Sequence, residues 1–157
     1  MCGGFLGRVI GDNMDFIIKN CKFQKLMNFT MSSIKTVEQL IEAYNNGERH
    51  FISLEFESSE SFDGLDFSGS TFEDCYFCAY FTNTNLTNAK FINSNIKTSD
   101  FRRANLTNAY MTGCNMESTR FKDSIRVDFI FENNFCMGRV VGQEFINYAL
   151  KYETEFE

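Results

Sequence analysis

Large apolar side chains recur at every fifth position along the middle of the chain. The series begins at Phe62, shifts once by one residue between Phe77 and Phe81, and continues to Phe121. Its thirteen members are all apolar: Phe62, Phe67, Phe72, Phe77, Phe81, Leu86, Phe91, Ile96, Phe101, Leu106, Met111, Met116 and Phe121. A period of five matches neither the repeat of an amphipathic helix nor the alternation of a simple strand. The chain must therefore bend regularly and return a large side chain to the interior after each bend.

A second series lies two residues before each large residue and consists of small side chains. Eleven of its thirteen members are small, and the exceptions are Glu60 and Leu65. The members predicted to lie in the core with the large residues are Cys75, Ala79, Ala89, Ala104, Ala109 and Cys114. Gly and Asn are frequent two residues after the large position, and both tolerate corner conformations that other residues resist. These coupled series predict a solenoid.

Three segments resemble the A(D/N)LXX motif of the pentapeptide-repeat family: Ala89-Lys90-Phe91, Ala104-Asn105-Leu106 and Ala109-Tyr110-Met111. The resemblance covers residues 51–121, with an extension to Phe131 as the alternative, and implies an all-β solenoid, a right-handed quadrilateral β-helix of about four coils. Stacking of residues twenty apart predicts ladders such as Phe62, Phe81, Phe101 and Phe121. The ladder of Phe67, Leu86 and Leu106 meets Arg126, where the regular core is expected to end.

Helix patterns flank the predicted solenoid. Thr36 and Gln39 form a capping box, and Val37, Leu40, Ile41 and Tyr44 follow at helical spacing, so a helix over residues 36–46 is expected to cover the first coil. Val141, Phe145, Tyr148, Ala149 and Tyr152 predict a second amphipathic helix, which either caps the last coil or pairs with another subunit. The predicted organisation is an N-terminal extension (1–34, with Met31 as an alternative start), an N-terminal capping helix (35–50), the β-helix (51–135) and a C-terminal helix and tail (136–157).

Composition and the absence of targeting patterns indicate the compartment of the protein. The 157 residues include six Cys and 19 Phe but no Pro and no Trp. Because the sequence has no apolar run long enough to span a membrane and no signal-peptide pattern, we expect a cytoplasmic protein with reduced thiols and no membrane partner.

Candidate chemistry is sparse. Cys75 and Cys78 have the spacing of a redox motif, but Cys75 occupies a small core position, so core packing is favoured over a thiol switch. His50 is the only His and has no surrounding ligand set. We therefore predict no catalytic residues, no metal and no cofactor.

Charge changes sign along the predicted rod. Residues 51–89 contain seven acids and no Lys or Arg, whereas residues 90–122 contain six bases against Asp100 and Glu117. Arg102, Arg103 and Arg120 are the candidate interaction surface. The alternative is an ordinary solvated surface; the sharper hypothesis is a polar rod that orients a partner or another copy.

These observations predict a non-enzymatic protein-interaction or scaffold module with an unidentified protein partner, and with homo-oligomerisation as an option. The resemblance implies an alternative, a DNA mimic that binds or inhibits a type II topoisomerase (gyrase). Such mimicry requires a strongly acidic rod, whereas residues 62–121 hold six acids and five bases. Direct nucleic-acid binding is disfavoured because the sequence pI is about 4.9.

Overall fold

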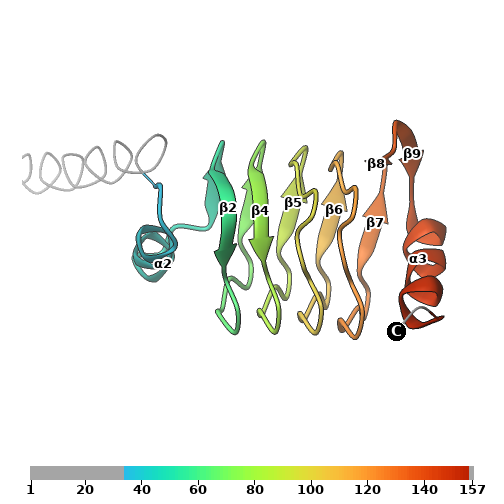
Figure 1. Ribbon diagram of the computed structural model, residues 1–157. Coiled ribbons are helices and arrows are strands. Elements are labelled where there is room, and N and C mark those ends of the chain that lie inside the picture. The colour runs from blue at the N-terminus through green and yellow to red at the C-terminus, as the bar shows by residue number, and fades with distance from the viewer. Residues whose placement is uncertain (1–33, 156–157) are drawn as a thin grey trace, which may run out of the picture.

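Short parallel strands stacked along one axis form the body of the molecule (Figure 1). The structure is a computed structural model that describes residues 34–155. It is a right-handed, four-sided β-helix of about four coils with a helix at each end, which confirms the predicted fold class. The elements are α2 (Val37–Asn45), β1 (His50–Ile52), β2 (Glu55–Ser61), β3 (Thr71–Glu73), β4 (Tyr76–Tyr80), β5 (Lys90–Ile92), β6 (Tyr110–Thr112), β7 (Ile130–Glu132), β8 (Asn134–Cys136), β9 (Arg139–Val141) and α3 (Gln143–Glu155).

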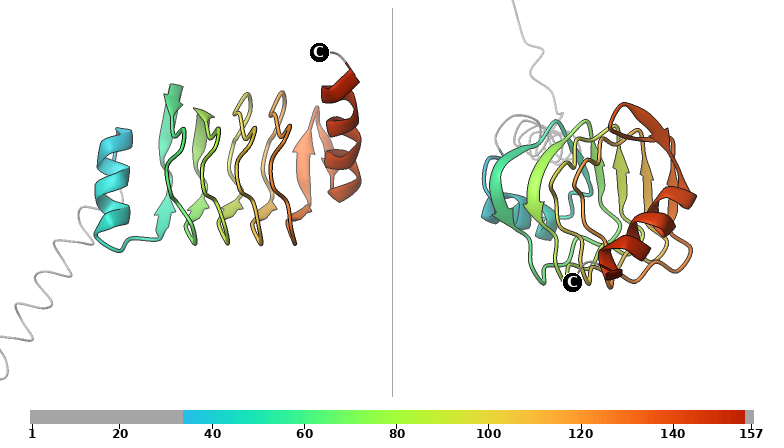
Figure 2. Two further views of the ribbon diagram at one scale, coloured as in Figure 1. Left: turned by 90° about the horizontal axis from the view of Figure 1, so that it is seen from below. Right: turned by 45° about the vertical axis from the view of Figure 1, so that its right-hand side comes forward.

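Backbone pairing between successive coils defines four faces (Figure 2). Face 1 is the parallel sheet β1-β3-β5-β6-β7. Face 2 contains β2 and β4 and continues through bridges at Asn95, Asn115 and Phe135. Face 3 aligns Ser61, Tyr80, Asp100 and Arg120, and face 4 aligns Asp66, Asn85, Asn105 and Ile125. Each face therefore presents one position of every coil as an axial ladder.

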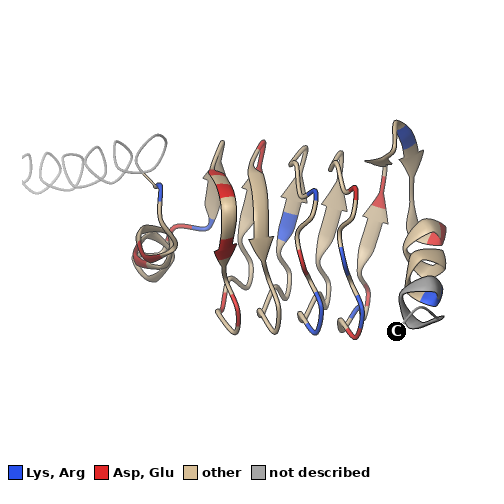
Figure 3. Cartoon of the chain, viewed as in Figure 1, with Lys and Arg blue, Asp and Glu red and all other residues tan. Residues whose placement is uncertain are grey.

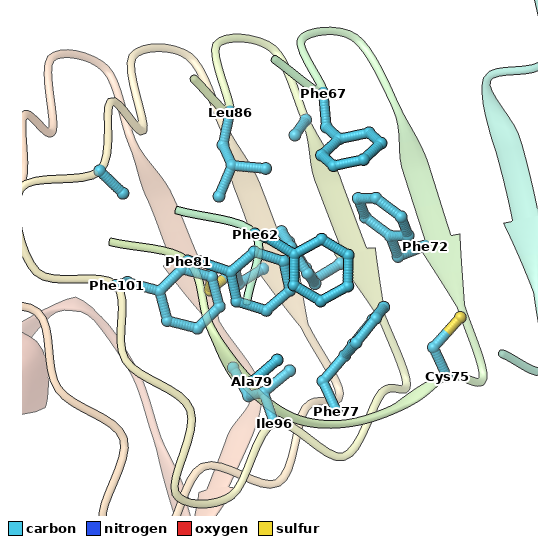
Figure 4. Close-up of a cluster of buried hydrophobic side chains, with 14 of the residues drawn as sticks. Phe62, Phe67, Phe72, Cys75, Phe77, Ala79, Phe81, Leu86, Ile96 and Phe101 are labelled. Atoms are coloured by element: carbon cyan, nitrogen blue, oxygen red, sulfur yellow. The ribbon is translucent and has the colours of Figure 1, made fainter. Parts of the chain in front are cut away.

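Stacked aromatic rings fill the interior (Figure 4). Ring centroids are 4.7 Å apart for Phe62 and Phe81, and 4.8 Å apart for Phe81 and Phe101. The ladder then continues to Phe121 at 5.3 Å. All thirteen large residues of the five-residue series are buried, as are Cys75, Ala79, Ala89, Ala104, Ala109 and Cys114. These side chains leave water together, and their burial is the main source of stability.

Several small polar residues in the interior, though not Ser70, satisfy backbone groups of neighbouring coils. The hydroxyl of Thr84 donates to the carbonyl of Phe62 at 2.8 Å, and the hydroxyl of Ser99 donates to that of Phe77 at 3.0 Å. Such hydrogen bonds allow a hydroxyl to replace Ala at a core position without the cost of an unpaired buried donor.

Residues with positive φ turn the chain at the corners. Asn83, Asn88 and Asn93 have φ values of 55°, 59° and 50°. Asn tolerates this left-handed conformation better than most residues because its short polar side chain bonds locally. The frequent Asn and Gly of the sequence thus mark the corners.

The one-residue shift in the repeat removes one residue of positive φ. The first coil has one residue more than the regular twenty, because Phe51 pairs with Phe72, and the second has one residue fewer, because Phe72 pairs with Phe91. The register of β2 and β4 shifts between Phe56 and Glu60, which is a β-bulge. No residue between Asp74 and Asn83 has a positive φ. Strand β4 therefore passes from face 2 to face 3 without a left-handed residue.

The N-terminal helix forms with its predicted cap. The backbone N–H of Gln39 donates to Thr36 Oγ1 at 3.3 Å, and Gln39 Oε1 accepts from the N–H of Thr36 at 3.2 Å. Val37, Leu40 and Ala43 join the core, and the hydroxyl of Tyr44 donates to the carbonyl of Ser68 at 3.1 Å. Helix α2 thus packs on the first coil.

The core continues beyond Arg126 on part of the coil. Met111 pairs with Phe131, and Phe131 is buried, within the predicted β-helix over 51–135. Among the described residues, the bridges of face 3 end at Arg120 and those of face 4 at Ile125. The guanidinium of the next residue, Arg126, donates to the carbonyl of Phe121 at 3.1 Å and to Ser124 Oγ at 2.8 Å. An antiparallel hairpin, β8–β9, then precedes α3.

The prediction for the C-terminal helix is confirmed in part, because Val141 and Phe145 pack against the core as expected. Ile146 is fully buried and Phe145 and Leu150 pack against the core, whereas Tyr148 is 59% exposed. The side chain of Tyr152 lies outside the described residues, as do residues 1–33, which include almost all of the predicted extension and the alternative start at Met31. Among the described helices, none is sufficiently long and apolar to cross a bilayer.

Candidate protein-interaction surface

The described residues offer no grouped metal ligands. Within residues 34–155, no three His, Cys, Asp or Glu side chains lie together as a metal site. His50 instead pairs with Glu73 on face 1, with Nε2 and Oε2 2.8 Å apart. This pair joins two neighbouring coils at the surface.

The two cysteines with the spacing of a redox motif differ in burial. Cys75 directly precedes strand β4 and faces the interior, whereas Cys78 lies within β4 and faces outward. Cys75 is buried, and its thiol donates to the carbonyl of Glu73 at 3.3 Å. Burial raises the pKa of Cys75 to about 11 and that of Cys114, on the same corner column, to about 12. These thiols stay protonated and pack as small apolar side chains.

Cys78 lies at the corner where the neighbouring coils have Ser59 and Thr98, both with positive φ. Its sulfur is 3.3 Å from Thr98 Oγ1, and this hydrogen bond lowers the pKa of the thiol. Cys75 and Cys78 therefore occupy different environments.

The predicted interaction residues lie on face 3 and its flanking corner. The guanidinium of Arg102 makes two contacts with the carboxylate of Asp100: Nη2 is 2.7 Å from Oδ2 and Nε is 3.0 Å from Oδ1. Asp100 is only 3% exposed, and burial opposes its ionisation, but the hydrogen bonds from Arg102 and the charges of Arg102 and Arg120 hold the pKa of this carboxyl below its usual value. The ion pair with Asp100 thus neutralises part of the charge of Arg102.

Arg103 and Arg120 are more exposed than Arg102. Arg103 donates from Nε to Asn83 Oδ1 at 2.9 Å, and Asn83 donates in turn to Asp63 at 2.7 Å. This chain of contacts joins three coils along one corner and orients the guanidinium. Arg120 lies in the same axial ladder as Tyr80 and Asp100.

Face 3 and its two corners comprise residues 60–64, 79–83, 99–103 and 119–123; we call this set the dipolar face. In its first two coils the only charged residues are Glu60 and Asp63. Its last two coils carry four bases and two acids: Arg102, Arg103, Arg120, Lys122, Asp100 and Asp123. The charge is therefore −2 at one end and +2 at the other, and Figure 3 shows acids concentrated around β2 and Lys and Arg in the later coils.

Two exposed tyrosines were missed by the sequence analysis, Tyr80 on the dipolar face and Tyr76 on face 2. Tyr76 is 39% and Tyr80 47% exposed, and both point outward from β4 on either side of Cys78. The signal was present in the sequence, because the shift between Phe77 and Phe81 coincides with the five-residue strand β4.

A separate set of exposed apolar side chains lies at the C-terminal end. Ile125 and Val127 occupy the outward positions of face 4, where the two preceding coils have Asn and Thr. In hairpin β8–β9, Met137 and Val140 are also exposed. This end is less polar than the dipolar face.

Comparison with known proteins identifies the repeated segment. The family model described as Pentapeptide repeats matches residues 61–102 and 79–117, with eight copies. No curated protein matches the sequence.

Similar solved structures include three pentapeptide repeat proteins. One, from the cyanobacterium Cyanothece 51142, is 13% identical with a TM-score of 0.34, over 52% of this chain and 82% of that one. HetL, involved in heterocyst differentiation regulation in Nostoc sp. strain PCC 7120, is 13% identical with a TM-score of 0.26, over 60% of this chain and 50% of that one. The third, from the Arabidopsis thaliana thylakoid lumen, is 22% identical with a TM-score of 0.26, over 62% of this chain and 75% of that one.

Proposed function

We propose that this chain, whose residues 61–102 and 79–117 match the model of the pentapeptide-repeat family, is a non-enzymatic protein-interaction module whose partner binds the outside of the rod. The partner is a protein, and the dipolar face is the surface that recognises it. Repeat solenoids commonly use their extended, regular surfaces in this way.

The observation that carries the proposal is the separation of charge on a rod whose interior is filled. Phe62, Phe81 and Phe101 are fully buried, so the interior is occupied by packed side chains. The dipolar face, in contrast, changes from −2 to +2 along its length. A surface of this kind orients a charged partner and increases its association rate, with a strong dependence on salt.

The geometry gives less support to imitation of DNA. A DNA mimic presents acidic side chains along its whole length, since duplex DNA carries one charge per about 1.7 Å of axis. Arg103 and Arg120 interrupt any such pattern in the last two coils. We therefore favour a partner of mixed charge over gyrase.

We also infer a reducing, cytoplasm-like compartment and neither membrane nor nucleic acid as direct ligands. The four described cysteines, Cys75, Cys78, Cys114 and Cys136, are not joined in disulfides. Their neighbours supply hydrogen bonds and packing rather than partner sulfurs, as expected where thiols remain reduced.

The proposal is tested by affinity capture with a matched pair of variants. The tagged chain, Arg120→Glu and Lys90→Glu are each incubated with lysate of the source organism at low and high salt, and captured proteins are quantified by mass spectrometry. Arg120 lies on face 3 and Lys90 on face 1, both are exposed, and both substitutions change the net charge equally.

We expect a partner that is captured by the parent chain and by Lys90→Glu, is lost at high salt, and is reduced at least about fivefold by Arg120→Glu. Equal capture by all three chains would exclude the dipolar face as the binding surface. Gyrase subunits among the captured proteins would instead favour the mimicry alternative.

A further inference from the structure

We propose that the dipolar face is self-complementary and binds the same face of a second copy, with the two rods antiparallel. This inference rests on the proposed function, because it assigns one partner to the interaction surface. The second copy is the occupant that the charges themselves specify, since each end of the face carries the charge that the other end requires.

A two-fold axis in the plane of the interface and perpendicular to the rods satisfies this charge pattern. Such an axis reverses the order of the coils but keeps each axial ladder opposite itself, so the first coil faces the fourth and the second faces the third. It is the isologous arrangement that most homodimers use. A parallel arrangement would instead place like charges against each other.

The outer coils supply the attraction. Ser61 lies at the position that faces Arg120 of the partner subunit, because Ser61, Tyr80, Asp100 and Arg120 form one ladder. Asp63 lies two residues after Ser61, as Lys122 does after Arg120, and therefore faces Lys122 of the partner subunit. The two-fold axis creates this contact between Asp63 and Lys122 twice.

The inner coils supply apolar and aromatic contact. Tyr80 is 47% exposed and lies opposite Asp100 of the partner subunit, which is only 3% exposed and is held by its ion pair with Arg102. The ring of Tyr80 therefore contacts the guanidinium of Arg102, because the face of an aromatic ring attracts a cation. Strand β4 presents Tyr80 on its outer side.

The size of the face limits the strength of this contact. Four coils at a spacing of about 4.8 Å give a face only about 20 Å long. A face of this length buries less area than a standard interface, which buries about 800 Å² per partner. We therefore expect a weak, rapidly exchanging dimer whose stability depends on salt.

Sedimentation velocity on the purified full-length chain tests the arrangement. Concentration series are measured at about 0.01 M and about 0.5 M salt for the parent chain, Lys122→Glu, Asp63→Lys and the double variant Asp63→Lys/Lys122→Glu. Lys90→Glu on face 1 is the control with the same change in charge as Lys122→Glu.

We expect dimerisation of the parent chain and of Lys90→Glu at low salt and its loss at high salt. Each single variant on the dipolar face should reduce the association constant at least about fivefold, because every substitution is present twice in the dimer and replaces attraction by repulsion. The double variant should regain the parent value to within about threefold, since it restores opposite charges across the interface.

Rescue by the double variant separates a lost contact from a damaged fold. A monomer at low salt, or a dimer unchanged by the single variants, would overturn this inference. Neither result would affect a partner captured from lysate, so the proposed function would stand. Conversely, if capture fails but dimerisation depends on charge, the second copy is the partner. That result would refute only the hypothesis that the dipolar face binds a different protein.

Discussion

Each position of the pentapeptide repeat has a fixed physical role at the scale of single residues. Phe91 is fully buried between neighbouring rings, with its centroid 5.0 Å from that of Phe72. Thr87 lies on the outer surface and bonds to Asn85 in its own coil, with a distance of 2.7 Å between Thr87 Oγ1 and Asn85 Oδ1. Residues four positions apart can therefore contribute very differently to stability.

We predict that Phe91→Ala lowers the free energy of unfolding by about 3–5 kcal/mol, because it removes a large buried side chain and leaves a cavity. Thr87→Ala should change it by no more than about 0.5 kcal/mol, since its side chain contributes to no core. Chemical denaturation measures both. Similar losses for the two variants would contradict the assignment of inward and outward positions.

A second prediction at the residue scale concerns the buried carboxylate. Because Arg102 and Arg120 keep the pKa of Asp100 low in the folded chain, its ionised form stabilises the fold above the unfolded pKa of about 3.9, and this contribution is lost as pH falls through the folded pKa. Asp100→Asn lacks this titration.

The difference in unfolding free energy between the parent chain and Asp100→Asn should therefore be largest near neutral pH and shrink as pH falls below about 4. Thermal or urea unfolding followed across acidic pH measures it. A difference that is constant with pH would show that the ion pair between Asp100 and Arg102 does not contribute through its charge.

The coil and its corners form the next scale. Gly69 and Gly113 both occupy corners, with φ values of 69° and 68°, but their surroundings differ. A Cβ at Gly69 would meet no heavy atom within 4 Å, whereas a Cβ at Gly113 would collide with Oδ1 of Asn93, which belongs to the preceding coil. The stack of coils thus restricts one glycine more than the other.

Gly69→Ala should lower stability by about 1 kcal/mol, the usual cost of a left-handed conformation for Ala. Gly113→Ala should cost more, because the same conformational penalty is joined by displacement of the Asn93 side chain. Parallel denaturation of the two variants isolates the contact. Equal losses would mean that Asn93 rotates away without cost.

The ends and the shifted repeat are also features of this scale. The cap at Thr36 and Gln39 was predictable because a capping box depends on neighbours in sequence. The buried face of α3 was not, because Ile146 and Phe145 could each serve as the apolar side of an isolated helix. Contact with the last coil selects Ile146, Leu150 and part of Phe145.

At the scale of the whole molecule, the coils combine short polar surfaces into one continuous pattern of charge. Glu60 and Asp63 are close in sequence but lie at the far end of the dipolar face from Arg120 and Lys122. The capture and sedimentation experiments both use this separation, one with foreign partners and one with a second copy. Salt dependence links them, because exposed charges are screened within about a Debye length.

The fold class follows from the sequence alone, since a period of five with paired large and small positions is compatible with few backbone paths. The sequence also marks the corners at Gly and Asn, because both adopt positive φ locally. The corners at Thr98 and Arg103 are known only from the structure, because nothing in the residue type predicts their positive φ. The structure likewise shows how the repeat shift is absorbed: β2 bulges, and β4 exposes Tyr76 and Tyr80 without a residue of positive φ between them.

The tertiary structure likewise decided which charges act together. Asp100 and Arg102 neutralise much of each other's charge. Arg103 is instead linked to Asp63, two coils away, by hydrogen bonds through Asn83. A count of acids and bases along the chain cannot separate these cases, because residues about twenty apart in sequence are neighbours in space. The physical reason is that periodicity is a local property of the chain, whereas electrostatic and packing energies depend on distances between coils.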